Sequence, residues 1–229
     1  MPEAKTDGRR RPRSPQGQGG RLREELIAAA DRILARTDDE EGLALRAVAR
    51  EAGVAAPSVY LHFANKEELV EAVMLGHFAG LREALREATA DVADPAAGLR
   101  AGCLAYCRFG LANPGPYRVM FGPRTTAFPT TSWDEIPGAD TFGLLVEGVA
   151  ACMAVGVAPV SDPLRVATGV WAALHGIVSL RQPVPTFPWP PVEALVEDVV
   201  VGLVGVAPAV PAAPGAAPTA APPAERRPP

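Results

Sequence analysis

The chain has 229 residues, a net charge of −4, three cysteines and 48% hydrophobic residues. This composition is typical of a soluble globular protein, and three cysteines are too few for the disulfide framework of a small secreted one. No apolar segment follows the N-terminus, and prolines interrupt the uncharged run after residue 199, so the sequence predicts neither a secretion signal nor a membrane span. We therefore expect a cytoplasmic protein that does not associate with a membrane.

The two ends of the chain differ from the rest in composition. Residues 1–20 are rich in Arg, Pro and Gly, and the first 23 residues hold seven Lys or Arg and two acidic residues. Such a segment is predicted to be a disordered basic arm that binds an anion, the alternative being a solubilising tail. Residues 207–229 are mostly Ala and Pro and are predicted to be a disordered tail.

Residues 45–66 predict two short helices joined by a sharp turn, after a first amphipathic helix that begins near residue 21. Gly53 is the residue most able to adopt the positive φ of such a turn, and Pro57 falls in the first turn of the second helix, where a missing N–H costs little. The side chains expected to face the core are Leu22, Leu26, Ile33, Leu34, Leu45, Val48, Ala49, Ala52, Val59 and Phe63, and those expected in solvent are Arg46, Arg50 and Glu51.

The second of these two helices, over residues 55–62, presents a slim and partly polar outer face. A major groove about 12 Å wide admits such a helix and lets its side chains reach base edges. The residues that follow complete a specific spacing, Tyr60-x-His62-Phe63-x-x-Lys66-x-x-Leu69. Residues 21–73 thus resemble the DNA-binding domain of the tetracycline-repressor (TetR) family of transcriptional regulators.

The resemblance implies a DNA-contacting role for seven positions. These positions are Arg46, Ala55, Ala56, Ser58, Tyr60, His62 and Lys66. Phenol, imidazole and ammonium groups suit phosphate oxygens, so Tyr60, His62 and Lys66 are assigned to the backbone, whereas Arg46 is the main candidate for reading guanine. The structural alternatives are a half-buried core tyrosine, a surface histidine and a lysine that only begins a helix.

Helix starts in this domain differ in their capping residues. Ala44 and Ala55 stand where members of the family often have Ser or Thr, and each missing cap costs on the order of 1 kcal/mol. In contrast, Asn65 with Glu68 three residues later predicts a capping box at the start of the fourth helix.

The fold class predicted for the whole chain is all-α. A three-helix DNA-binding domain over residues 21–66 precedes a helical effector-binding and dimerisation domain over residues 67–206. Asp162 and Pro163 form a good cap and first-position pair for one of its helices. The helices predicted after the second short helix are 66–92, 95–112, 117–121, 139–155, 163–181 and 191–206, with a mobile loop over 122–137 that is suited to cover a pocket.

The last two predicted helices are apolar on more than one face, which predicts that a second copy of the chain covers them in a homodimer. A two-fold dimer requires a near-palindromic DNA operator. The spacing Trp171-x-x-x-His175-Gly176 also resembles a C-terminal domain found in one branch of the family, as does the segment from Asn113 to Phe121. The family implies a repressor that a small-molecule effector releases from DNA.

Aromatic and methionine side chains commonly line apolar ligand sites, although most such residues only pack the core. His175 is the least ordinary candidate, because it is a titratable group on an apolar helix. The candidate pocket residues are Tyr106, Phe109, Tyr117, Met120, Phe121, Phe142, Met153, Trp171 and His175.

Three other functions compete with this interpretation. No nucleophile elbow, phosphate loop or His-Glu-x-x-His pair occurs, so we expect no enzyme activity and no cofactor. Cys103 and Cys107, four residues apart and within reach of Cys152 in some folds, raise the alternative of a thiol- or metal-responsive regulator, although buried structural cysteines are commoner. A helix-turn-helix that binds a protein partner would lack the salt dependence of DNA binding.

Overall fold

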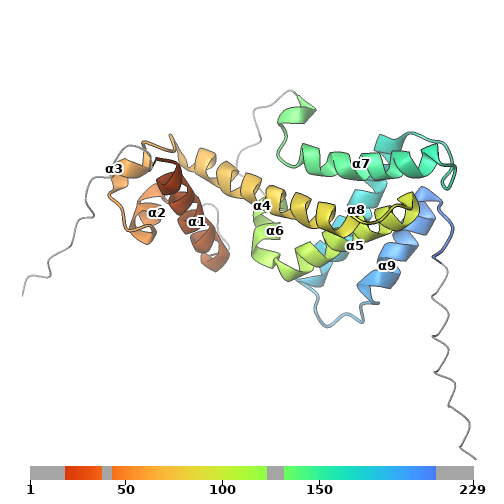
Figure 1. Ribbon diagram of the computed structural model, residues 1–229. Helices are drawn as coiled ribbons and strands as arrows, with labels where there is room; N and C mark the ends of the chain where they lie inside the picture. The colour runs from red at the N-terminus through yellow and green to blue at the C-terminus, as the bar shows by residue number, and fades with distance from the viewer. Residues whose placement is uncertain (1–18, 38–42, 123–131, 210–229) are drawn as a thin grey trace, which may run out of the picture.

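The computed structural model describes residues 19–37, 43–122 and 132–209, and all regular structure in these ranges is helical, as the sequence predicts (Figure 1). In the same ranges no helix has the length and apolar character needed to cross a bilayer. The α-helices are α1 (Gly19–Thr37), α2 (Leu45–Glu51), α3 (Ala56–Val59), α4 (Lys66–Thr89), α5 (Pro95–Ala112), α6 (Pro114–Phe121), α7 (Ala139–Ala154), α8 (Pro163–Arg181) and α9 (Val192–Val199), with a 3-10 turn η1 (Trp133–Glu135) and a π-helical end η2 (Val200–Val204).

Two hydrophobic cores divide the molecule, and α4 runs through both (Figure 1). The first core lies among α1, α2, α3 and the first turns of α4, where Leu26, Val59 and Leu69 are fully buried. The second lies among α4 to α9. Within α4 the first core ends at Val73 and the second begins at Met74.

Three helix starts have side-chain caps, and the sequence analysis predicts two of them, at Asn65 and Asp162. The Asn65 side chain accepts a hydrogen bond from the Glu68 backbone N–H at 2.8 Å, and the Glu68 carboxylate accepts from the N–H of Ala64 at 2.7 Å, one residue earlier than a standard capping box. Asp162 caps α8, and Asp94 caps α5 in the same way. Ala44 and Ala55 occupy N-cap positions of α2 and α3 and provide no side-chain bond.

Other boundaries differ from the predicted ones. Helix α6 begins at Pro114, not at 117, because proline lacks only an N–H that the first turn leaves unpaired anyway. Helix α3 is a single turn, α4 ends at Thr89, and the last helix changes to π geometry at Val200 before Gly205, with φ of 81°, ends it. Helix α1 begins at Gly19, so the helix starts two residues earlier than the predicted 21.

Several expectations concern residues outside the described ranges. They are the conformation of the basic arm over 1–18, most of the loop over 122–137, and the tail from residue 210 onward.

In the body, α5 lies in the centre and packs against α4, α7, α8 and α9. Gly110 makes this arrangement possible, because a Cβ at this position would lie 2.6 Å from the Val178 side chain and 2.8 Å from the ring of Tyr117. The absence of a side chain therefore lets α5 approach α8 and α6 closely.

Candidate functional sites: a DNA-reading surface and an internal cavity

The turn between α2 and α3 is fixed by backbone geometry and by two buried side chains. Gly53 has a φ of 68°, and the Val54 N–H donates to the Ala49 carbonyl at 2.9 Å. Val59 and Phe63 are 0% and 1% exposed and anchor α3 to the first core. Because these two residues face inward, the opposite side of α3 and of the turn after it faces outward, as predicted.

This outward surface contains the residues that the sequence resemblance assigns to DNA. Tyr60 is 56% exposed, which excludes the alternative of a core tyrosine, and Ala55 is also exposed. The sequence interpretation missed Leu61, which is 83% exposed beside Tyr60. The sequence signal for an exposed Leu61 was its position directly after Tyr60, which was itself predicted to face outward. The remaining members of the surface, Ala56, Ser58, His62 and Lys66, are half-buried.

The charges on α2 are arranged differently from the prediction that all three lie in solvent. Arg46 and Arg50 are exposed, but Glu51 accepts hydrogen bonds from Arg32 Nε and Arg36 Nη2, both at 2.9 Å. The Arg36 and Arg32 guanidinium groups lower the pKa of Glu51 from its usual 4.5 to about 2. Glu51 therefore ties α2 to α1, and the two arginines of α2 are left to face solvent.

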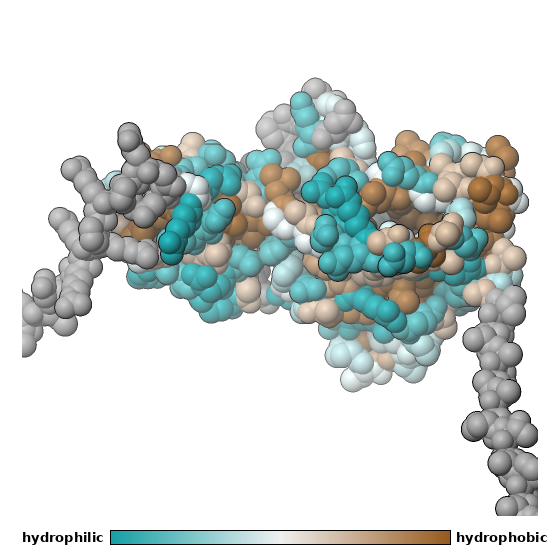
Figure 2. All heavy atoms as spheres, viewed as in Figure 1, coloured by the Kyte–Doolittle hydropathy of each residue, from teal (hydrophilic) through white to brown (hydrophobic). Residues whose placement is uncertain are grey.

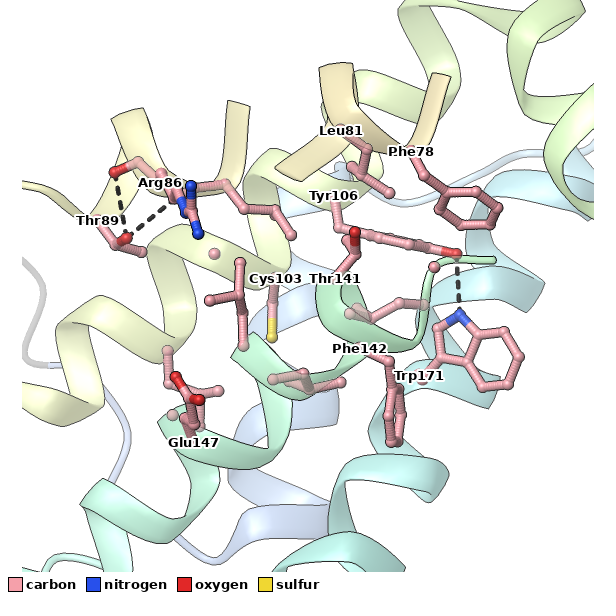
Figure 3. A pocket seen from close by; sticks show the side chains of 18 of the residues that line it. Phe78, Leu81, Arg86, Thr89, Cys103, Tyr106, Thr141, Phe142, Glu147 and Trp171 are labelled. Carbon is pink, nitrogen blue, oxygen red and sulfur yellow. Dashed lines mark hydrogen bonds between the residues drawn. The ribbon is translucent and has the colours of Figure 1, made fainter. Parts of the chain in front are cut away.

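The body encloses a cavity of about 650 Å³ between α4, α5 and α7, with contributions from α6, η1 and α8 (Figure 3). Five of the predicted pocket residues line it: Tyr106, Met120, Phe121, Phe142 and Trp171. The other four, Phe109, Tyr117, Met153 and His175, lie outside the lining of this cavity.

Tyr117 and His175 lie outside the cavity because their polar atoms face one another. The Tyr117 hydroxyl is 2.7 Å from His175 Nδ1 and 2.8 Å from the Tyr106 hydroxyl. Trp171 Nε1 in turn donates to the Tyr106 hydroxyl at 3.3 Å. Burial raises the pKa of Tyr106 to about 12 and lowers that of His175, so these groups form an uncharged hydrogen-bonded chain at neutral pH.

The sequence interpretation missed most of the cavity wall. Helix α4 and the turn after it supply residues from Met74 to Val92, and η1 supplies Trp133. Gly102 and Gly148 also line the cavity, and glycines on the inner faces of two packed helices were a signal that space remains between them.

The three cysteines are free and buried. Burial raises the pKa of the Cys103 and Cys107 thiols to about 12, which leaves almost no thiolate at neutral pH. Within the described part of the chain, no group of three or more His, Cys, Asp or Glu side chains could hold a metal ion. The raised pKa values of these thiols oppose the alternative of a thiol-responsive regulator.

Fold and sites together define a helix-turn-helix DNA-binding domain joined to a helical ligand-binding domain. Residues 26–73 match the model for bacterial regulatory proteins of the tetR family, and residues 99–203 match that for a tetracyclin repressor-like C-terminal domain, so the two cover about two thirds of the chain. The chain belongs to the TetR family of DNA-binding transcriptional regulators.

Solved structures agree with this fold. A protein of unknown function from Rhodococcus sp. RHA1 is 28% identical, with a TM-score of 0.68 over 80% of this chain and 95% of that one. The TetR family transcriptional regulator PfmR from Thermus thermophilus is 22% identical, with a TM-score of 0.59 over 78% and 96%. AibR, solved in complex with isovaleryl coenzyme A and operator DNA, is 18% identical, with a TM-score of 0.61 over 81% and 99%.

Proposed function

We propose that the protein is a repressor that binds a palindromic operator as a homodimer and leaves it when a small molecule occupies the cavity. The observation that carries this proposal is the orientation of α3: Val59 and Phe63 are buried, so the side that holds Tyr60 faces outward. A single helical turn with small neighbouring side chains fits the major groove.

The proposed contacts with DNA are of two kinds, to phosphates and to bases. Tyr60, His62 and Lys66 hydrogen-bond to phosphates, and Arg46 reads guanine from the adjacent helix. The remaining proposed positions, which approach base edges or nearby phosphates, are Ala55, Ala56 and Ser58. We assign the first turns of α4, up to Val73, to the DNA-binding domain together with residues 21–66, because they complete its core.

The exposed side of α8 supports a homodimer. Leu180 is 54% exposed near the end of this helix, and the exposed Gly169 and Ala172 and the half-buried Gly176 lie on the same stripe. On the neighbouring η2, Leu203 is 48% exposed. Small residues flanked by leucines let two helices approach closely, which suits a four-helix bundle made by two copies of the chain.

Release from DNA follows from the position of α4. This helix lines the cavity with Met74 and Phe78 and holds the DNA-binding domain through Leu69 and Val73. Its His77 also bonds to Asp31 of α1, with Nε2 and Oδ1 3.0 Å apart. A ligand that shifts α4 moves the two reading surfaces of a dimer away from the separation of about 34–36 Å between successive major grooves. A coupling of about 1–3 kcal/mol would lower operator affinity by about 5- to 150-fold.

Selection of bound sequences from a random DNA pool tests the DNA-binding part of the proposal. We expect a near-palindrome, and we expect Tyr60→Ala combined with Lys66→Ala to abolish its binding at moderate salt while the thermal melt of the protein is retained. In the single variant Lys66→Ala, the slope of log affinity against log salt should fall by about one. A non-palindromic product would reject the two-fold homodimer on DNA, and salt-independent binding would reject the phosphate contacts in favour of a protein partner.

A further inference from the structure

The cavity is elongated. Its lining runs along α7 from Ala139 to Ala151, which corresponds to about 18 Å at 1.5 Å per residue. Along α4 the lining runs from Met74 to Thr89, which corresponds to about 22 Å at the same rise per residue. The space is therefore a channel that runs between α4 and α5 on one side and α7 on the other, and it suits a long, narrow ligand.

Polar side chains inside the channel are already bonded within the protein. Thr89 donates to the carbonyl oxygen one turn earlier at 3.0 Å, and Thr141 donates to the neighbouring carboxylate at 3.3 Å. The Tyr106 hydroxyl bonds to Trp171 and Tyr117. A polar ligand group placed deep in the channel would lose its water without gaining a partner.

The two ends of the channel differ (Figure 3). Arg86 and Glu147, the only charged residues among the described residues of the lining, lie toward one end, and the aromatic rings of Phe78, Phe142 and Trp171 lie toward the other. Both charged residues are exposed, and neither forms an ion pair with another residue in the described ranges. The exposed charged residues can therefore hold a hydrated polar group, whereas the polar atoms of Tyr106 and Trp171 near the aromatic rings already bond to one another.

We propose that the effector is a single-chain amphiphile, with one elongated hydrocarbon body and one polar end group. The polar end lies at Arg86 and Glu147, and the hydrocarbon end packs against Phe78, Phe142 and Trp171. This inference rests on the proposed role of the cavity as the effector site. Because Arg86 and Glu147 carry opposite charges, the site selects for the shape of the molecule and the position of its polar group, not for one sign of charge.

Calorimetry on the full chain with defined probes tests the orientation. From 1-octanol to 1-dodecanol, affinity should rise about fourfold for each added CH₂. The probe 1,12-dodecanediol carries a second hydroxyl that must enter the aromatic end, so it should bind at least about fivefold more weakly than 1-dodecanol. Equal affinity for the diol, or no dependence on chain length, would overturn the proposal.

Charge variants locate the polar end. Dodecanoate and dodecylamine should bind the unmodified protein within about threefold of one another. We expect Arg86→Gln to weaken dodecanoate about two- to fivefold relative to 1-dodecanol, and Glu147→Gln to weaken dodecylamine similarly. If both variants leave the preference between the two charged probes unchanged, the polar end lies elsewhere and the assignment is wrong.

A matched pair of glycine variants tests the channel itself. At Gly102 an added Cβ would meet only a Thr89 methyl at 3.7 Å, so Gly102→Leu should fill the channel and weaken 1-dodecanol binding at least about tenfold. Gly143→Leu is the control, because Gly143 lies outside the lining and its Cβ would face open space. Equal effects of the two variants would overturn the channel assignment.

Operator affinity is measured in a separate experiment, so that failure of the proposed ligand class can be distinguished from failure of the proposed release from DNA. If the alcohols bind as expected but leave operator affinity unchanged, the ligand class stands and the proposed release mechanism fails. If no probe binds while the operator is recognised, the ligand class fails and DNA recognition stands.

Discussion

Tyr117 connects two sequence motifs that lie 58 residues apart. Its hydroxyl bonds to His175 and to Tyr106, and its ring stacks on the imidazole with centroids 5.5 Å apart. Phe121, from the same motif, contacts both Trp171 and His175. The Trp-His-Gly spacing and the segment that begins at Asn113 therefore form a single packed cluster that fixes α6 against α8.

Removing one hydroxyl from this cluster should lower the stability of the folded protein. Tyr117→Phe leaves the buried Tyr106 hydroxyl and the half-buried His175 imidazole each short of a hydrogen bond, and we expect the free energy of unfolding to fall by about 1–3 kcal/mol. Urea unfolding measures this loss. The same substitution at the exposed Tyr60 is the control and should change stability by less than about 0.5 kcal/mol. Equal losses at the two positions would contradict this account.

Glu51 should make stability depend on pH. Its folded pKa of about 2 lies below its usual 4.5, so its stabilising effect is complete above pH 4.5 and disappears as the pH falls toward 2. Glu51→Gln should therefore be less stable than the unmodified protein at pH 7, with a difference that narrows below pH 4.5. Urea midpoints measured from neutral pH down into the acid range give this difference. A difference that stays constant across this range would exclude the ion pair as its cause.

At the scale of single elements, the starts of α2 and α3 lack side-chain caps, so adding a cap should raise the stability of the protein. Ala44 is exposed and has the extended backbone of an N-cap, with φ of −109° and ψ of 135°. Ala44→Ser should raise the free energy of unfolding by about 0.5–2 kcal/mol, measured by thermal or urea denaturation. Ala28→Ser, at an exposed position inside α1, is the control and should lower stability slightly.

Elements with strong end signals could be predicted from the sequence. Helix α5 has the predicted bounds because Asp94 and Pro95 begin it and Asn113 ends it, and Asp162 with Pro163 does the same for the start of α8. Helix α6 begins earlier than predicted because Pro114 and Pro116 lie in its first turn, where proline is tolerated. The local signals were present, but proline has different meanings inside a helix and at its start.

The cavity could not be predicted in the same way, because its wall depends on which helix faces meet in space. Phe109 and Phe121 both look like pocket residues in sequence, yet only Phe121 lines the cavity. The contribution of α4 depends on its packing against α5 and α7, which no local pattern specifies. Side-chain type thus indicated that a pocket was possible, and tertiary packing decided its position.

At the scale of the whole molecule, exposed apolar surface remains on the body. Figure 2 shows hydrophobic residues gathered where α7 ends, and there Val155 and Val160 are 58% and 90% exposed. A second exposed apolar surface is the α8 stripe that we assign to the dimer. Surfaces of this kind on a monomer commonly mark sites of association.

A charge on the α8 stripe should separate the dimer. Ala172→Glu places a carboxylate between two apolar helices, where desolvation is unfavourable, so we expect a monomer by light scattering and a large loss of operator affinity. Ala79→Glu, at an exposed position on α4, is the control and should leave the molar mass of the dimer in solution unchanged. A dimer that persists in Ala172→Glu would exclude this face of α8.

Because α4 passes from one hydrophobic core to the other between Val73 and Met74, neither half can melt without fraying a helix that the other half needs. Calorimetry should accordingly record one cooperative heat-absorption peak instead of two. Gly76 lies inside α4 just past this crossing, is exposed, and has open space where a Cβ would stand, so it lowers the helical stability of the segment that both halves share. Gly76→Ala should shift the whole peak upward by about 1–4 °C, since it adds about 0.5–1 kcal/mol. The two halves would then unfold together at a single temperature.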